Sequence, residues 1–302
     1  MKPKHLALAI LITAIWGLNF SVIKIGLKSV DPFILAGIRF SLCALPVVFF
    51  IKRPDTPWRY LLAYGFVFGV GLWGVVNLGI HAGLSAGIAS LVLQFSAFFT
   101  ILFGAVVFHE SVSKYQLTGI VIALLGLASI ILVSDGTVTL TGVALVIFGA
   151  ISWSVANVII KKSGTREVLA FLVWSSLFSP LPLFAIAYLT RGMAGYAALA
   201  IQLDLPTVLS ILFQAYPTTV FGYWIWNSLL KQYPVSTVAP LSLLVPIFGM
   251  LGSVAIFHEV LGLTKVLAIV LIVAGLTIGL YGKQLAVRLR RQPVETSKMT
   301  AQ

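Results

Sequence analysis

Long apolar segments, separated by short polar or charged stretches, occupy almost the whole chain. A helix needs about 20 apolar residues to cross the hydrocarbon core of a bilayer. Breaks at charged, proline and glycine clusters predict ten such helices, at residues 5–26, 32–51, 60–81, 85–108, 115–134, 139–160, 168–190, 206–230, 235–257 and 264–282. The pattern predicts an all-α polytopic membrane protein, with a polar tail that we expect to be disordered from Pro293 onward.

The composition supports a lipid environment. Hydrophobic residues make up 60% of the 302 residues, charged residues make up 9%, and the mean hydropathy is +1.07. A soluble protein of this length cannot bury so much apolar surface. Cys43 is the only cysteine, which excludes an intrachain disulfide and a thiolate metal site. The first apolar stretch follows Met1 and Lys2 like a signal peptide, but no small-residue cleavage site follows it, and we expect this helix to be retained.

The net charge of +12 lies mostly in short loops and in the tail, where it reads as a topology signal and a contact to anionic lipid rather than to nucleic acid. Fifteen lysines and arginines fall on the side of the N-terminus. Four, namely Lys24, Lys28, Arg191 and Lys265, fall on the opposite side. The positive-inside rule therefore predicts a multi-pass protein of the bacterial inner membrane with both termini in the cytoplasm.

Two short sequences recur at a fixed spacing and divide the chain into halves. Phe108-His109-Glu110 closes the fourth predicted span, and Phe257-His258-Glu259 closes the ninth, 149 positions later. Trp16 in the first span has a counterpart in Trp153 of the sixth. Each half carries five spans, an odd number, so the second half is expected to insert upside down, as in many transporters. We expect two inverted five-helix repeats around a central cavity, at residues 1–136 and 137–283, and a basic cytoplasmic tail at 284–302.

Three further stretches are distinctive: Trp16-Gly17-Leu18-Asn19-Phe20, Arg39-Phe40, and Ala239-Pro240-Leu241-Ser242-Leu243-Leu244-Val245-Pro246. In these residues the chain resembles the EamA family of the drug/metabolite transporter superfamily, and within it the bacterial exporters of O-acetylserine and cysteine. The likeness extends from about residue 6 to residue 282. One departure is His109-Glu110-Ser111, where relatives often carry a basic residue after the glutamate. This departure speaks against a special role for that loop.

The resemblance implies secondary export of small metabolites, such as amino acids or amino-acid-like compounds, by alternating access. It implies a small-molecule substrate, contact with membrane lipid, and a monomer or weak homo-oligomer. A multidrug exchanger or another metabolite exchanger of the same superfamily is the alternative. A membrane-embedded enzyme would need histidine or acidic clusters, and a receptor would not need an inverted repeat.

Two helix faces combine a tryptophan with an asparagine. Trp16, Asn19 and Phe20 lie at i, i+3 and i+4 on one face of the first span. Trp153 and Asn157 share a face of its inverted counterpart. Together these faces predict a substrate cavity with apolar walls and a few hydrogen-bonding groups. The alternative is that they hold helices together, since interhelical polar bonds contribute up to about 2 kcal/mol.

Other spans add polar and aromatic residues that could line the same cavity, although each is equally explained by packing. These further candidates are Trp73, Asn77, Gln94, Phe98, Trp174, Ser175, Tyr223 and Ser242. Pro240 and Pro246 fall inside the ninth span, where each removes a helix hydrogen bond and frees a carbonyl. They predict either a hinge or a static bend.

Arg39 lies well inside the second predicted span, between uncharged stretches. An arginine at the centre of a membrane helix costs about 2.5–3.5 kcal/mol on insertion scales, so it should face protein or water. Two interpretations remain open. Arg39 is either a countercharge for a substrate carboxylate or a structural anchor that bonds to neighbouring helices.

The sequence contains no catalytic constellation. All eight acidic residues fall in predicted loops, at span ends or in the tail, and no glycine-rich phosphate loop or histidine cluster is present. We therefore expect no enzyme, no metal and no cofactor, and no ATP-driven pump within this chain. Because no acidic residue is expected inside a span, a proton-coupled mechanism would lack a buried carboxylate to carry the proton.

Overall fold

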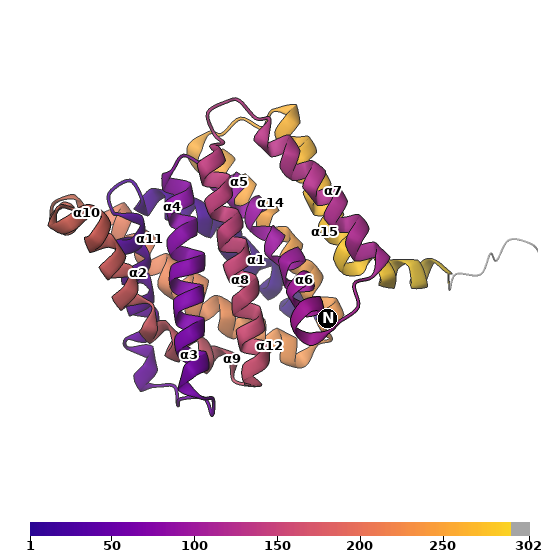
Figure 1. The fold of residues 1–302 in the computed structure, drawn as a ribbon, viewed down its shortest axis with the longest axis horizontal. Helices are drawn as coiled ribbons and strands as arrows, with labels where there is room; N and C mark the ends of the chain where they lie inside the picture. Colours follow the sequence, from indigo (N-terminus) through magenta and orange to yellow (C-terminus); the bar gives the residue numbers. More distant parts are fainter. Residues whose placement is uncertain (291–302) are drawn as a thin grey trace, which may run out of the picture.

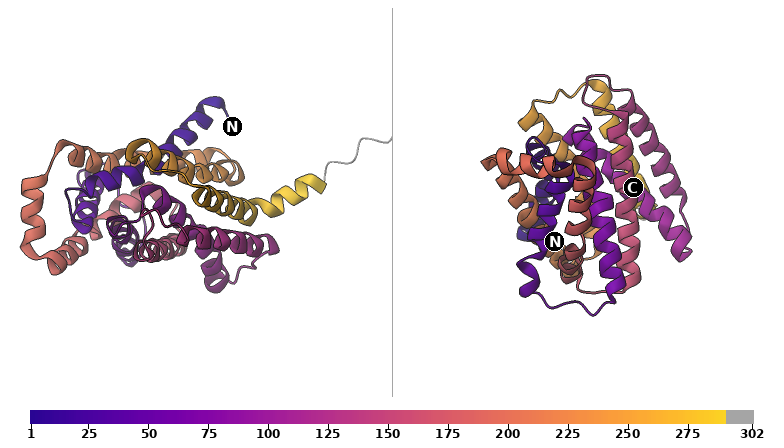
Figure 2. Two further views of the ribbon diagram at one scale, coloured as in Figure 1. Left: turned by 90° about the horizontal axis from the view of Figure 1, so that it is seen from above. Right: turned by 60° about the vertical axis from the view of Figure 1, so that its left-hand side comes forward.

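The computed structural model describes residues 1–290, and every secondary-structure element in this range is a helix (Figure 1). The final helix, α15 (Leu263–Arg290), continues past the predicted end of the tenth span and extends beyond the bundle (Figure 2). The first part of the predicted tail is therefore helical. The predicted disorder after Pro293 lies outside the described residues.

Ten helical stretches correspond to the ten predicted spans. The first half contains α1 (Pro3–Gly26), α2 (Pro32–Ala44), η1 (Val47–Phe49), α3 (Trp58–Gly65), η2 (Phe66–Gly74), α4 (Val75–His81), α5 (Ala86–Val92), η3 (Leu93–Phe95), α6 (Ser96–Phe108) and α7 (Lys114–Ile131). The second half contains α8 (Leu140–Ser163), α9 (Val168–Ser175), η4 (Ser176–Phe178), α10 (Pro180–Gln202), α11 (Leu205–Phe213), η5 (Gln214–Phe221), α12 (Gly222–Gln232), α13 (Val235–Val238), η6 (Ala239–Leu243), α14 (Leu244–Phe257) and α15. Short π or 3₁₀ segments interrupt most of these spans without ending them.

Nine of these stretches, among the described residues, are long and apolar enough to cross a membrane. The eighth, residues 205–232, is continuous from α11 to α12 but more polar, because it carries Gln214, Thr218, Thr219 and Asn227. The seventh is longer than predicted, because α10 continues through a kink at Gly192 to residue 202.

Side-chain caps fix several helix starts where the sequence changes from loop to span. The carboxylate of Asp31 accepts hydrogen bonds from the backbone N–H groups of Phe33 and Ile34 at the start of α2. Ser113 and Gln116 form a reciprocal capping box at the start of α7. These caps explain why short polar loops are enough to separate neighbouring spans.

The two halves repeat their irregularities as well as their helices. The third and eighth spans carry the π segments η2 and η5, and the fourth and ninth carry the 3₁₀ segments η3 and η6. His109 and His258 end α6 and α14 in the same left-handed conformation, with φ of 54° and 53°. α1 packs against α14 as its counterpart α8 packs against α6, and α7 pairs with its own counterpart α15. The protein is thus built from two five-helix repeats inserted in opposite directions.

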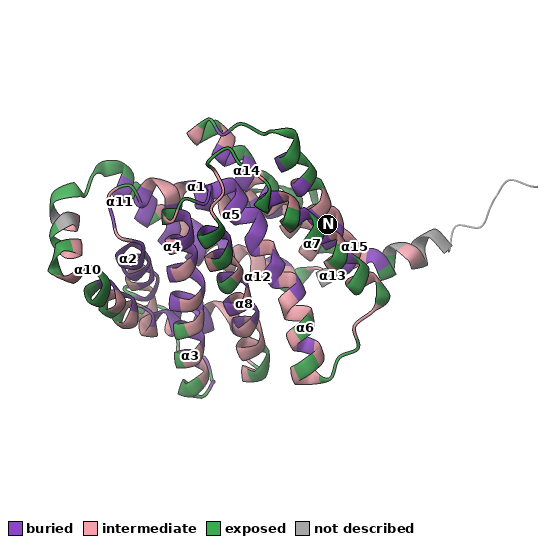
Figure 3. Ribbon diagram, turned by 45° about the horizontal axis from the view of Figure 1, so that its top comes forward, coloured by how far each residue is buried: buried purple, intermediate pink, exposed green. Residues whose placement is uncertain are grey.

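The loops divide between two ends of the bundle. The Lys161 end, as we call it, holds the N-terminus and residues 45–57, 109–113 and 164–167, and Lys161 there pairs with Glu110. The Glu259 end holds residues 27–31, 82–85, 132–139 and 258–262, and Glu259 there contacts Ser85. Buried residues concentrate between these ends, in the middle of the bundle, where α5 is buried along its entire length (Figure 3).

A central cavity as the candidate substrate site

A cavity of about 480 Å³ lies inside the bundle. Residues of both repeats line it, from spans one to four and six to nine. Its walls reach from the middle of α1, at Asn19, to Ile160 and Val168 at the Lys161 end. None of the loops at the Glu259 end contributes to the lining. The cavity is therefore positioned to communicate with the Lys161 end.

Ten of the candidate residues from the sequence line this cavity. They are Trp16, Asn19, Phe20, Arg39, Trp73, Gln94, Trp153, Asn157, Tyr223 and Ser242. Pro240 lies in the 3₁₀ segment η6, next to the lining residue Ala239, and Pro246 lies in the first turn of α14, where a missing N–H breaks no helical bond. The span is therefore interrupted at η6 and not at Pro246.

The structure places the other four candidates outside the lining. Asn77 donates to the carbonyl of Pro32 (3.2 Å), and Trp174 donates to the carbonyl of Ile51 (2.9 Å), so both join neighbouring spans. Phe98 packs against Phe95, and Ser175 is buried. The acceptors of Asn77 and Trp174 lie far away in the sequence, and spacing within one helix does not reveal them.

Aromatic side chains form one wall of the cavity. The indole Nε1 of Trp16 donates to the carbonyl of Thr218 at 2.9 Å. Its ring lies 5.4 Å from that of Tyr223 and 5.1 Å from that of Trp226. The Thr218 carbonyl belongs to the π segment η5, and π segments frequently occur at functional sites. Trp16 is thus both part of the cavity wall and a contact that holds η5 in place.

Arg39 is 1% exposed, and it is the one charged residue that lines the cavity in the described part of the chain. Its Nε and Nη2 donate to the hydroxyl of Thr219 at 3.3 and 2.9 Å. That hydroxyl in turn donates to the carbonyl of Gln214. The guanidinium carbon lies 4.2 Å from the centre of the Trp73 ring, within the range of a cation–π contact. Within residues 1–290, no carboxylate oxygen lies within 4.0 Å of the guanidinium.

Three buried N–H donors that belong to cavity-lining residues have no hydrogen-bond partner among the described residues. They are Nη1 of Arg39, Nδ2 of Asn19 and Nε1 of Trp73. Asn19 is held in place because its Oδ1 accepts from the hydroxyl of Thr218 at 3.1 Å. Leaving such a donor unsatisfied costs about 1–3 kcal/mol, and more for a charged group. The arrangement favours a ligand that is negatively charged and accepts several hydrogen bonds.

The residues that orient Asn19 and Arg39 were not among the site residues predicted from the sequence. Thr218 and Thr219 orient Asn19 and Arg39, but they come from η5, about 200 positions later in the chain. Tyr64 and Ser90 also line the cavity and were missed. A pair of threonines after a proline carries no signal by itself, so only the packing of the eighth span on the first two reveals their role.

The described residues offer no evident metal site. No group of three or more His, Cys, Asp or Glu side chains in this part of the chain is close enough to hold a metal ion. Cys43 is buried, and its thiol donates weakly to the carbonyl of Ala215 at 3.5 Å.

Comparisons with known proteins agree with this architecture. A chain of known crystal structure is 19% identical, aligns over 94% of this chain and 99% of its own length, and has a TM-score of 0.60, which shows a shared fold. A probable amino-acid metabolite efflux pump of Salmonella typhimurium is 40% identical over 288 residues, covering 93% of this chain and 96% of its own length. A protein of the same name from Escherichia coli strain K12 is 38% identical over 290 residues, with the same coverage.

The sequence profile of one family matches the chain twice, at residues 4–132 and 140–281. These two matches cover nearly all of the spans and fall on the two structural repeats. With its helices, its repeats and its central cavity, the chain belongs to the EamA-like transporter family.

Proposed function

We propose that this protein is a secondary exporter of small amino-acid metabolites, of the cysteine and O-acetylserine type, that carries them through the central cavity by alternating access. The observation that carries the proposal is the set of three unpartnered donors on Arg39, Asn19 and Trp73. The names of the Salmonella typhimurium and Escherichia coli relatives support the substrate class.

A substrate carboxylate fits this set of donors. Its two oxygens can accept several hydrogen bonds, and its charge is opposite to that of Arg39. In a buried site, a charge-assisted hydrogen bond is roughly twice as strong as a neutral one. Arg39 would supply the charge and Nη1, while Asn19 and Trp73 would supply the remaining donors. Thr219 already holds one edge of the guanidinium through Nε and Nη2, so little ordering is needed on binding.

The rest of the cavity suits a short and variable side chain. Trp16 and Tyr223 give an aromatic wall, and Gln94, Asn157 and Ser242 add polar side chains. Described residues bring no acidic side chain to the lining, so a cationic drug would meet the arginine without a countercharge. The charge of the cavity therefore favours an amino-acid metabolite over the multidrug alternative.

Alternating access needs a flexible point where the walls of the cavity can move. We propose η6 as this hinge, because it is a 3₁₀ segment between α13 and α14 that contains Pro240 and carries the lining residues Ala239 and Ser242. The α14 helix after it begins with a turn that accommodates Pro246. A movement at η6 would turn α14, and with it the wall that faces α1.

The proposed direction of transport requires the Lys161 end to face the cytoplasm. Reporter fusions after Lys114 and after Lys283 should then report a cytoplasmic location, whereas a fusion after Asp135 should report the opposite side. The physical reason is the excess of lysine and arginine at the Lys161 end. A cytoplasmic signal from the Asp135 fusion would contradict this orientation.

Transport itself should be measured with purified protein in liposomes, using labelled cysteine, O-acetylserine, other amino acids and a cationic drug. Trp153→Ala should lower kcat/KM for the best substrate about fivefold to tenfold, because an aromatic contact contributes about 0.5–1.5 kcal/mol beyond its buried area. The melting temperature should change little, since Trp153 makes no side-chain hydrogen bond among the described residues and lines the cavity.

The matched control is Phe148→Ala on the same helix, α8, because Phe148 is exposed and does not line the cavity. This variant should transport at the parent rate. Absence of transport for every amino-acid compound by the folded parent would refute the proposed function. Equal losses in both variants would remove Trp153 from the site but leave the function standing.

A further inference from the structure

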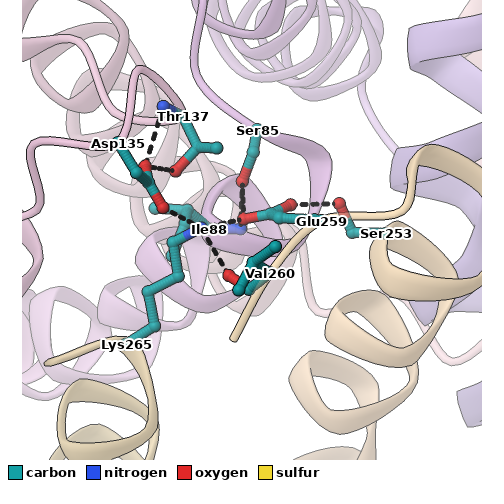
Figure 4. A network of polar contacts seen from close by, with 8 residues as sticks. All are labelled: Ser85, Ile88, Asp135, Thr137, Ser253, Glu259, Val260 and Lys265. Atoms are coloured by element: carbon teal, nitrogen blue, oxygen red, sulfur yellow. Dashed lines mark hydrogen bonds and ion pairs between the residues drawn. The ribbon is translucent and has the colours of Figure 1, made fainter. Parts of the chain in front are cut away.

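Glu259 lies in a loop, yet it is only 8% exposed. It follows His258, whose left-handed conformation ends α14 and turns the chain back toward the bundle. Its Oε1 accepts from the hydroxyl of Ser85 (3.0 Å) and from Nζ of Lys265 (2.8 Å), and its Oε2 accepts from the hydroxyl of Ser253 (Figure 4). Glu259 falls at a span end, as the sequence predicts, but the expectation of no buried carboxylate is wrong, because this loop folds inward onto two serines and a lysine.

Lys265 is 1% exposed and joins Glu259 to a second carboxylate. Its Nζ lies 2.7 Å from Oδ2 of Asp135 and donates to the carbonyl of Val260 at 3.1 Å (Figure 4). Partial burial raises the pKa of Asp135, but hydrogen bonds from Lys265 and Thr137 outweigh this effect and hold the pKa at about 2. Asp135 therefore stays ionised at neutral pH. We call Ser85, Asp135, Ser253, Glu259 and Lys265 the Glu259 network.

The Glu259 network ties together three spans and a loop. Ser85 caps the start of α5, Ser253 lies in α14, Lys265 lies at the start of α15, and Asp135 lies in the loop between α7 and α8. The same loop is bound a second time, because the backbone N–H of Ser85 donates to the carbonyl of Thr137 at 2.8 Å. Separating α5 from this cluster would break the Ser85–Glu259 hydrogen bond, and separating the 132–139 loop from it would break the Asp135–Lys265 ion pair, while the Glu259–Lys265 pair lies within the connection from α14 to α15.

The network lies beyond the closed end of the cavity. Ser90 is a lining residue, and it follows Ser85 by five residues on the buried helix α5, which is a distance of about 7.5 Å at 1.5 Å per residue. Between them, Gly87 lies directly against Met250 of α14, so no space is left at this level. The lining of the cavity extends toward the Lys161 end, and the Glu259 network joins the helices at the other end.

The repeat places a matching glutamate, Glu110, at the Lys161 end, but its contacts are weaker. Its one ion pair is to Lys161, and the two side chains are 53% and 55% exposed. The positions 149 residues before Ser253 and Lys265 are Gly104 and Gln116, and Gln116 is engaged in the capping box of α7. The two ends carry the same motif with unequal contacts. Exposed ion pairs contribute little, whereas removing one partner from a buried pair is strongly destabilising.

We infer that the Glu259 network keeps the Glu259 end of the cavity closed. Its contacts are more numerous and more buried than the Glu110–Lys161 pair at the other end. The empty transporter therefore rests with its cavity open at the Lys161 end. The inference rests on alternating access as proposed above. In an exporter, this resting state exposes the donors of the cavity to the compartment from which substrate is taken. Substrate binding must then supply the free energy that separates the network.

The test measures which side of the membrane reaches the cavity. In a Cys43→Ala background, Ala97→Cys serves as the reporter, because Ala97 lines the cavity and is only partly buried. A membrane-impermeant maleimide is applied to right-side-out and to inverted membrane vesicles. The parent should react from the Lys161 side alone. The double variant Glu259→Gln/Lys265→Met removes both buried charges together, so neither is left without a partner. It should react from the Glu259 side at least fivefold faster than the parent.

The repeat supplies the matched control, Glu110→Gln/Lys161→Met, which should not increase labelling from the Glu259 side. Asp135→Asn alters only the partly exposed partner of Lys265 and should give a smaller increase in the same direction, which keeps the test decisive if the double variant does not fold. The inference would be overturned if the folded variants were labelled from the Glu259 side no faster than the parent. It would also be overturned if the parent itself were labelled from that side. Labelling requires no transported substrate, so it separates this result from a failure of the proposed function.

Discussion

Replacing Arg39 by lysine should raise the KM for a carboxylate substrate about tenfold or more, while a substrate without a carboxylate keeps nearly its parent KM. A hydrogen bond to a charged group contributes about 1.5–3 kcal/mol, and the loss of one such bond corresponds to this range of KM. Lysine retains the positive charge, but its ammonium cannot reproduce the planar fork of the guanidinium. It cannot hold Thr219 and a carboxylate at once in the way that the three nitrogens of Arg39 allow.

The two interpretations of Arg39 give different results in this experiment. The structure shows an anchor, since two nitrogens donate to Thr219, and its third nitrogen, Nη1, is buried without a partner on a residue that lines the cavity. If anchoring were its whole role, Arg39→Lys would lower the melting temperature and reduce transport of both substrates in proportion. Arg191→Lys is the control, because Arg191 is an exposed arginine far from the cavity lining. Both KM values should be measured on one purified preparation in liposomes.

Replacing Gly17 by alanine should lower the melting temperature by several degrees, and replacement by valine should abolish folded protein. A Cβ atom at Gly17 would lie 2.5 Å from the carbonyl oxygen of Val245, 2.6 Å from Cβ of Phe248 and 2.7 Å from the backbone nitrogen of Gly249. Two of these three are backbone atoms, so α1 and α14 would have to move apart. Overpacking costs about 1–3 kcal/mol even where side chains can adjust.

The effect of Gly17→Ala should reach transport as well as stability, because Trp16 and Asn19 lie on the same helix on either side of this contact. Gly262→Ala is the control, because a Cβ atom at Gly262 meets nothing within 4 Å. Thermal unfolding in detergent, followed by tryptophan fluorescence, measures both variants. An unchanged melting temperature for Gly17→Ala would show that α1 and α14 do not rely on close backbone contact.

The spans and their inverted pairing could be predicted because hydrophobic length and the recurrence of Phe-His-Glu are properties of the sequence itself. The faces of Trp16 and Trp153 could be predicted for the same reason, since i, i+3 and i+4 spacing is local. Asn77 and Trp174 could not be assigned, because their acceptors are the carbonyls of Pro32 and Ile51 in other spans. In a membrane helix, a polar side chain that joins spans and one that lines a cavity have the same pattern.

Glu259 shows the opposite difficulty. A glutamate between two apolar spans normally lies in solvent, and nothing in its neighbours distinguishes it from Glu110. The difference arises from Ser85 and Lys265, whose approach depends on how α5 and α15 pack against α14. The likeness of the two Phe-His-Glu sequences predicted the repeat correctly but could not show that the two ends have unequal contacts.

The polar character of the eighth span has a consequence for how the protein is made. Several of its polar side chains bond within the span, since Gln214 donates to Ser210 and Thr219 donates to the carbonyl of Gln214. Two of its hydroxyls instead donate to the first span: Ser210 to the carbonyl of Val22, and Thr218 to Asn19. These two bonds form only when the eighth span packs on the first, and unsatisfied polar groups are costly in lipid. The first two spans leave the ribosome long before it and carry the complementary groups. We therefore expect the eighth span to insert more stably when the first span is already present to accept these bonds.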